Sequence, residues 1–286
     1  YADYEQLVGG VDTLFKDSSQ EIQRYAANAY KTAGLSANEY METVTGFSAS
    51  LIQSLGGDTE KAAKYADMAI TDMSDNANKM GTDMSSIQNA YQGFAKQNYT
   101  MLDNLKLGYG GTKQEMERLL ADAEKISGVK YDISSYADVV EAIHVMQESM
   151  DIAGTTAKEA EATISGSVNA LKSAVSNLIV GFGDADADME LLCNNMVDAF
   201  KTVVANITPV IENIVAALPT ALDALLTAVG ELLPTLLEAV TELFSQVLET
   251  LLSLLPQLIP AAVSALMTIV NTLIENLPLL IEAAVQ

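Results

Sequence analysis

The residue types that most often carry catalysis are scarce in this chain. His144 is the only histidine, and it lies beside apolar residues in a stretch with helical spacing. The single cysteine, Cys193, follows two leucines on a predicted helix. Side-chain catalysis needs a nucleophile beside a base, a paired acid and base, or a bound metal. Neither residue has such a partner in its local sequence, so we expect His144 to serve packing or the surface. We expect Cys193 to be a small buried hydrophobic group.

Three aspartates, Asp184, Asp186 and Asp188, alternate like the first ligands of a calcium-binding loop. Such a loop requires glycine at its sixth position and glutamate at its twelfth. The chain has Met189 and Asn195 at those positions. We therefore interpret the acidic run as a solvated linker that precedes a helix.

The segment 108–113, Gly-Tyr-Gly-Gly-Thr-Lys, superficially resembles a phosphate-binding loop. The Walker pattern needs Gly-Lys-Ser/Thr in that order after four spacer residues, together with a preceding strand. Neither condition is met, and a flexible turn before a helix start at Thr112 explains the glycines. The sequence thus predicts no catalytic residue, no metal, no cofactor and no small-molecule substrate, which indicates a non-enzymatic protein.

The composition narrows the possible partners. The 286 residues carry a net charge of −23 and are 49% hydrophobic, enough to bury a sizeable core. So acidic a surface repels phosphate backbones, and we expect no direct binding of nucleic acid. One cysteine excludes an internal disulfide framework and suits a reducing cytoplasm.

The sequence predicts that the elements that position these residues are helices. No proline occurs before Pro209, glycines mark the predicted helix ends, and only 129–133 could form a short strand, which we do not predict. Capping boxes, in which a hydroxyl and a carboxylate three residues later satisfy free amides, predict three helix starts: Ser36 with Glu39, Thr112 with Glu115, and Thr156 with Glu159. The predicted helices lie near 12–33, 37–55, 59–80, 83–106, 113–127, 136–152, 157–181 and 187–206. The fold class is all-α, with a helical domain at 1–206.

The remaining segment, 207–286, has a different character. Residues 202–286 contain no Lys or Arg and hold all six prolines. Apolar residues recur there every eleven positions, about 3.67 per helical turn, so they stay on one side of a long helix. We call this set the apolar stripe, and it comprises Leu236, Leu237, Phe244, Val247, Leu248, Leu255, Leu258, Ile259, Leu266, Ile269, Val270, Leu277, Leu280 and Ile281.

Three prolines, Pro234, Pro256 and Pro278, lie 22 residues apart, and each opens a similar phrase. Proline is tolerated at the first position of a helix, where its missing N–H is not needed. The segment is therefore either a series of helices of about 20 residues or one helix with regular kinks. Twenty-two helical residues rise about 33 Å, near the thickness of a bilayer core.

Two environments suit the apolar stripe. Residues 250–274 are uncharged over a length that can span a membrane, but the segment lacks the basic and aromatic residues that usually flank a span. The preceding unit, 235–253, keeps a polar face. We expect burial in a soluble homo-oligomeric bundle at rest, with a membrane-inserted second state that lines a pore. Because the chain begins without Met and the repeat runs to Gln286, we also expect it to be a piece of a longer polypeptide.

Residues 8–182 resemble the region of tailed-bacteriophage and prophage tail tape measure proteins that precedes their hydrophobic segment. The proline-phased segment after 208 is also similar to that hydrophobic segment. The resemblance covers more than half of the chain, and the matching stretches are 29–40, 56–63, 72–81, 89–112, 154–160 and 163–167.

The resemblance implies an extended helical protein in the lumen of the virion tail tube, synthesised in the bacterial cytoplasm. Its length would set tail length, and its partners would be tail-tube and tail-assembly proteins. It would leave ahead of the DNA at infection, in some phages helping to form a passage through the host membrane. The alternative function is a pore-forming or envelope-active helical protein in which 208–286 is the working part.

Overall fold

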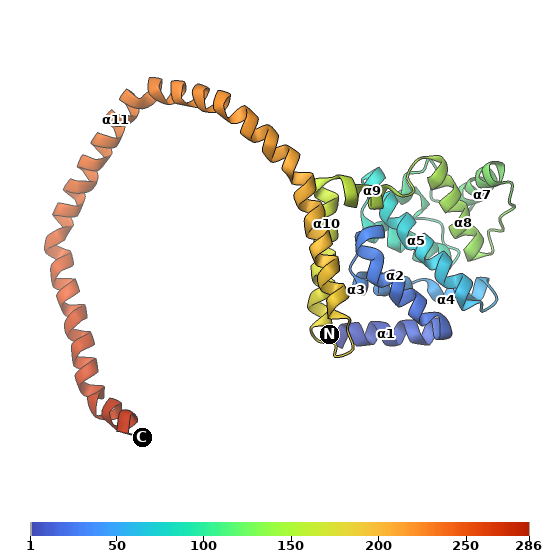
Figure 1. Ribbon diagram of the computed structural model, residues 1–286, viewed down its shortest axis with the longest axis horizontal. Coiled ribbons are helices and arrows are strands. Elements are labelled where there is room, and N and C mark those ends of the chain that lie inside the picture. Colours follow the sequence, from blue (N-terminus) through green and yellow to red (C-terminus); the bar gives the residue numbers. More distant parts are fainter. Residues whose placement is uncertain (1, 286) are drawn as a thin grey trace. The chain divides into compact units, whose positions relative to one another are not determined.

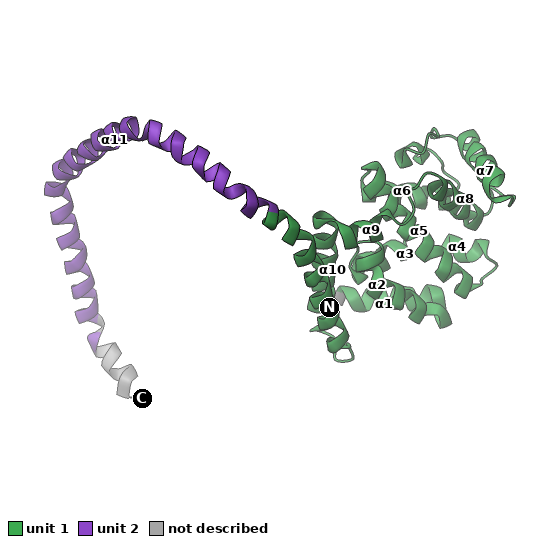
Figure 2. Ribbon diagram, turned by 45° about the horizontal axis from the view of Figure 1, so that its top comes forward, with its two compact units in different colours: residues 1–212 green, residues 213–286 purple. Residues whose placement is uncertain are grey.

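The computed structural model describes the backbone of residues 2–285, with side chains for 3–275 and Leu277. All regular elements in this range are helices, which confirms the all-α class, and 129–133 form a loop rather than a strand. The chain divides into two units, residues 1–212 and 213–286 (Figure 2). The predicted domain limit at 206/207 lies within a helix that is continuous across it.

The first unit consists of short and medium helices followed by the first turns of a long one (Figure 1). In chain order the elements are α1 (Ala2–Phe15), the 3-10 helix η1 (Lys16–Ser18), α2 (Ser19–Thr32), α3 (Ala37–Thr45), α4 (Ser48–Ser54), α5 (Thr59–Met80), α6 (Met84–Ala95), the 3-10 helix η2 (Leu102–Leu105), α7 (Lys113–Ser127), α8 (Tyr136–Ser149), α9 (Thr155–Ala162), α10 (Ile164–Gly181) and α11 (Met189–Val285).

Four predicted helices are each broken in two, at places that local sequence does not mark clearly. Lys16 and Gln97 have left-handed backbones, with φ of 50° and 58°, which end helical runs inside 12–33 and 83–106. Thr163 is extended and separates α9 from α10. Residues 37–55 break at Gly46, the C-cap residue that follows α3.

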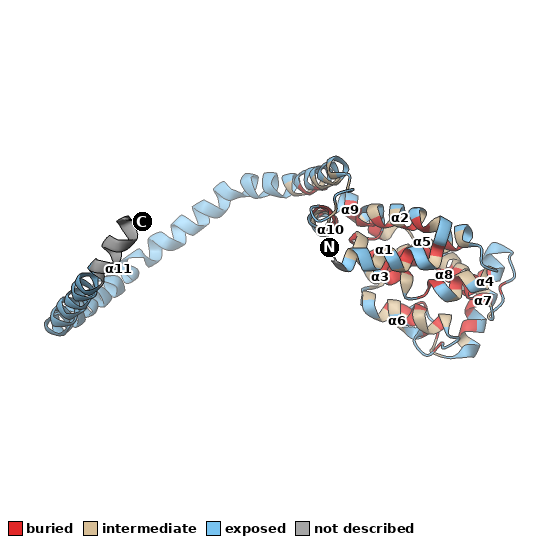
Figure 3. Ribbon diagram, turned by 90° about the horizontal axis from the view of Figure 1, so that it is seen from below, coloured by how far each residue is buried: buried red, intermediate tan, exposed pale blue. Residues whose placement is uncertain are grey.

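Helix α5 is the centre of the first unit and packs against helices on several sides, among them α4, α6, α8 and α9. Its inward face is rich in alanine, at positions 62, 63, 66 and 69, which allows neighbouring helix backbones to approach closely. Figure 3 shows that the buried residues of the first unit gather along the inward faces of its helices. Larger side chains from the surrounding helices fill the space that the alanines leave. The largest fully buried ones are Tyr30, Tyr40, Tyr91, Phe15 and Phe94.

The second unit continues α11, a single helix from Met189 to Val285 (Figure 1). The prolines therefore lie inside one helix instead of separating several. Each proline removes one backbone N–H, which leaves the carbonyl four residues earlier without its helical donor and favours bending there. Every described large apolar side chain from Val210 onward is exposed, by 39% or more.

Candidate functional site

The apolar stripe is the most extensive candidate site. The twelve members with described side chains, from Leu236 to Leu277, are between 43% and 67% exposed. The other two, Leu280 and Ile281, lie outside the residues whose side chains the structure describes. A continuous apolar surface of this length on an exposed helix is typical of a surface that contacts a protein or a membrane.

Several hydroxyl groups on the second unit form hydrogen bonds with the backbone of their own helix. The hydroxyls of Thr241, Ser245 and Thr268 donate to carbonyls four residues earlier, at 2.7–2.9 Å. Such bonds reduce the cost of removing these side chains from water. By length and composition alone, α11 is the one described helix that could cross a membrane, with a mean hydropathy of 1.7 over its most apolar window.

The predicted capping residues have three different outcomes. At the start of α3, Ser36 and Glu39 form the full reciprocal box: the Ser36 amide donates to Glu39 Oε2 at 2.8 Å, and the Glu39 amide donates to Ser36 Oγ at 3.3 Å. At the start of α7, Thr112 Oγ1 accepts from the Glu115 amide at 3.2 Å. The Glu115 carboxylate does not return to Thr112.

Glu115 is held instead by Arg118 and by the amide of Gly110, which donates to Glu115 Oε2 at 2.9 Å. The hydrogen bond from Arg118 and then that from Gly110 lower the pKa of Glu115 to about 2. This pair ties the glycine-containing loop 108–111 to the first turn of α7. The glycines thus serve a helix entry, as the sequence indicated.

The third predicted cap is wrong. Helix α9 begins at Thr155, so Thr156 is already helical, and its hydroxyl accepts from Asn78 Nδ2 at 2.8 Å. The fully buried carboxylate of Asp75 on α5 caps α9 instead, accepting from the amides of Gly154 at 2.6 Å and Thr156 at 2.8 Å. Glu159, the other member of the predicted box, lines the hollow described below.

His144 is held by a buried carboxylate. Its Nδ1 lies 2.9 and 3.0 Å from the two oxygens of Asp72, which is 1% exposed, and its Nε2 lies 3.4 Å from Glu148. Gln147 Nε2 also donates to the Asp72 carbonyl. The pair therefore joins α5 to α8. The Asp72 hydrogen bond raises the pKa of His144, and desolvation raises the pKa of Asp72 to about 6.

Both shifts make the fold more stable as pH falls. His144 binds its proton more tightly when folded, so its contribution is complete below about pH 6.5 and is lost as pH rises through its folded pKa. Asp72 is likewise protonated more readily when folded, and that contribution is lost between about pH 4 and 6. We expect the melting temperature of the full chain to fall by several degrees from pH 5 to pH 8.

The variant Asp72→Asn tests whether the pair causes this pH dependence of the melting temperature. Its control is Asp103→Asn, which makes the same charge change at an exposed residue. Thermal melts followed by circular dichroism should show a flatter pH dependence for Asp72→Asn and an unchanged one for Asp103→Asn. Equal slopes in the two variants would show that the pH dependence comes from overall charge rather than from the pair.

The prediction for Cys193 is wrong, because the thiol is exposed. The inward face of the first turns of α11 carries Met196, Ala199 and Val203, and position 193 lies beside that face.

In the acidic run before α11, Asp184 and Asp188 accept the backbone amides of the residues two and three positions later, respectively. Asp188 thereby caps α11. The described residues contain no group of three or more His, Cys, Asp or Glu side chains that could hold a metal.

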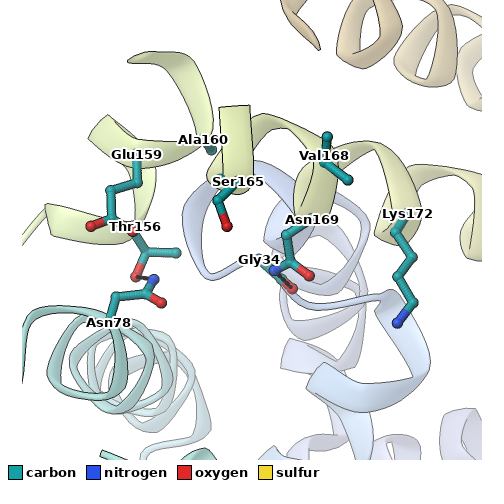
Figure 4. A pocket seen from close by; sticks show the side chains of 10 residues that line it. Gly34, Asn78, Thr156, Glu159, Ala160, Ser165, Val168, Asn169 and Lys172 are labelled. Atoms are coloured by element: carbon teal, nitrogen blue, oxygen red, sulfur yellow. Dashed lines mark hydrogen bonds between the residues drawn. The ribbon is translucent and has the colours of Figure 1, made fainter. Parts of the chain in front are cut away.

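A polar hollow that the sequence did not indicate lies where α9 meets α10. We call it the α9–α10 hollow; its volume is about 320 Å³ and it is drawn in Figure 4. Asn169 Nδ2 donates to the Gly34 carbonyl at 3.1 Å at its base. The lining residues are Gly34, Asn78, Thr156, Glu159, Ala160, Ser165, Gly166, Val168, Asn169 and Lys172.

Comparisons with known proteins give no counterpart for this arrangement: no family model, curated protein or solved structure matches the chain.

Proposed function

We propose that this chain is part of a tail tape measure protein, a structural component that sets tail length and scaffolds the tail tube. The observation that carries the proposal is α11, a helix of 97 residues whose apolar side chains are exposed along the second unit. The resemblance of residues 8–182 to the corresponding region of such proteins supports the same assignment.

A continuous helix suits a ruler because its length is proportional to residue number, at about 1.5 Å per residue. The 97 residues of α11 therefore correspond to about 145 Å along the helix axis. The apolar stripe would join copies of the chain in the lumen of the tube and pack against tail-tube and tail-assembly proteins. We propose no enzymatic activity for this stretch.

Deletion of residues 234–255 from the protein that assembles the tail should shorten the tail by about 33 Å, because 22 helical residues are removed. The deletion takes out two eleven-residue repeats, so the apolar stripe stays in phase across the junction. Electron microscopy of assembled tails measures the change.

The control replaces 234–255 with a second copy of 256–277, which keeps both length and apolar character, and tails should then keep their length. Unchanged tails after the deletion would overturn the ruler role of this segment.

The alternative is a pore-forming protein, favoured by the membrane-compatible length and hydropathy of α11. It also rests on the 25 uncharged residues at 250–274. The same deletion separates the two functions. Dye release from vesicles by the intact chain, lost on deletion while tail length is unchanged, would favour the pore.

A further inference from the structure

The α9–α10 hollow contains two charges that the fold does not use. Glu159 stands at one end and Lys172 at the other, as Figure 4 shows. No ion pair in the described part of the chain includes either residue. Lys172 is thus without a carboxylate partner although the sequence has 38 acidic residues and only 15 basic ones. An unpaired carboxylate and an unpaired ammonium in one concave site favour a ligand with both charges in the opposite order.

The groups between the two charges are neutral and polar. Ser165, Asn169 and Lys172 are spaced i, i+4 and i+7, so they follow one face of α10. The Ser165 hydroxyl enters no hydrogen bond with described residues, and Asn169 uses its amide nitrogen on Gly34 while its oxygen remains available. A hydroxyl and an amide oxygen are suitable partners for peptide groups.

The backbone positions of the two charged residues along α10 follow from the helix geometry. A Cβ built on Gly166 would lie 2.2 Å from the Glu159 carbonyl oxygen, so the Glu159 backbone abuts α10 at that residue. Lys172 lies six residues further along α10, a rise of about 9 Å. An extended peptide gains about 3.3–3.6 Å per residue, so a peptide of three or four residues matches this backbone rise in length.

We propose that the α9–α10 hollow binds a short peptide with free ends, three or four residues long. Its ammonium pairs with Glu159, its carboxylate pairs with Lys172, and its peptide groups contact Ser165 and Asn169. The walls come from the loop after α2, from α5, from α9 and from α10, so the site exists only in the folded first unit. This inference does not depend on the proposed role in the tail.

The test uses the full chain and oligoglycines of two to six residues, observed by saturation-transfer difference NMR. Because the site is open and each charge pair is partly solvated, we expect a Kd for triglycine in the millimolar range. Triglycine and tetraglycine should bind better than diglycine or hexaglycine. Triglycine with an acetylated amino end and an amidated carboxyl end should give no signal, because it lacks both charges.

Four single variants and one double variant locate the site. Glu159→Gln and Lys172→Met should each weaken triglycine binding about three- to tenfold, whereas Glu161→Gln and Lys158→Met, which change similar charges outside the hollow, should not. The double variant Glu159→Lys with Lys172→Glu should restore binding, because a reversed peptide then meets both charges. Circular dichroism checks that all variants keep their helices.

Absence of triglycine binding to the intact chain would overturn the proposal. Equal affinity in the intact chain and in the two hollow variants would also overturn it, as would an equal loss in the two outside controls.

Discussion

Replacing Asp75 with alanine should lower the free energy of unfolding of the first unit by about 2–4 kcal/mol. The carboxylate is fully buried and accepts the amides of Gly154 and Thr156, so its removal leaves two donors at the start of α9 without a partner. Each unsatisfied buried donor costs about 1–3 kcal/mol, and charged acceptors form the stronger bonds.

Chemical denaturation of the full chain measures the loss. Asp75→Asn keeps one acceptor oxygen and should cost less than Asp75→Ala, while the exposed Asp103→Ala should cost little. Hydrogen exchange gives a local readout, because the amides of Gly154 and Thr156 should exchange faster in Asp75→Ala. A loss no larger than that of Asp103→Ala would show that α9 does not depend on this cap.

The parts of the fold that sequence could predict are those set by local chemistry. Helices α5 and α7 match the predicted ranges 59–80 and 113–127 at both ends. Each ends on a glycine with a left-handed backbone, Gly81 and Gly128, a conformation that glycine adopts at little cost. The capping box of Ser36 and Glu39 is equally local, with its two residues three positions apart.

The breaks inside predicted helices could not be read in the same way. Lys16 and Gln97 adopt left-handed backbones that lysine and glutamine disfavour in isolation, so packing of the surrounding helices must impose them. Tertiary packing outweighs helix propensity at these two positions. Thr163 differs from them: its backbone is extended, and its hydroxyl caps α10 by accepting the Gly166 amide at 3.0 Å.

The candidate sites likewise fall into those set by local sequence and those formed by residues far apart in the chain. The apolar stripe follows from an eleven-residue period within one helix and was predictable. The cap of α9 joins Asp75 to residues 79 and 81 positions later, and the Asp72–His144 pair spans 72 positions. The α9–α10 hollow draws on four separate segments. No spacing rule connects such distant residues, so these contacts required the structure.

The corner between α9 and α10 also supports the first turns of α11. Asn206 Nδ2 donates to the carbonyls of Glu161 at 3.2 Å and Thr163 at 3.1 Å, the residues at the corner between α9 and α10. The apolar packing nearby is thin and relies on alanines, among them Ala170, Ala174 and Ala199. The geometry of this corner therefore determines whether α11 begins in its observed place on the first unit.

Replacing Gly166 with alanine should disrupt this corner and cost about 2–4 kcal/mol of unfolding free energy. The added Cβ would lie 2.2 Å from the Glu159 carbonyl oxygen and 2.8 Å from the Ala160 nitrogen, and both are backbone atoms that no side-chain rotation can move. Helices α9 and α10 must then separate, and strain of this kind is among the larger effects of single substitutions. The Asn206 hydrogen bonds should weaken together with the corner.

Gly9→Ala in α1 is the matched control, because its added Cβ meets no atom within 4 Å. There the same chemical change should stabilise the chain by about 0.5–1 kcal/mol, since alanine favours helix over glycine. Denaturation of both variants should thus give shifts of opposite sign. Faster exchange of amides near Asn206 in Gly166→Ala alone would link the corner to the start of α11, whereas stabilisation by both substitutions would contradict close packing of α9 on α10.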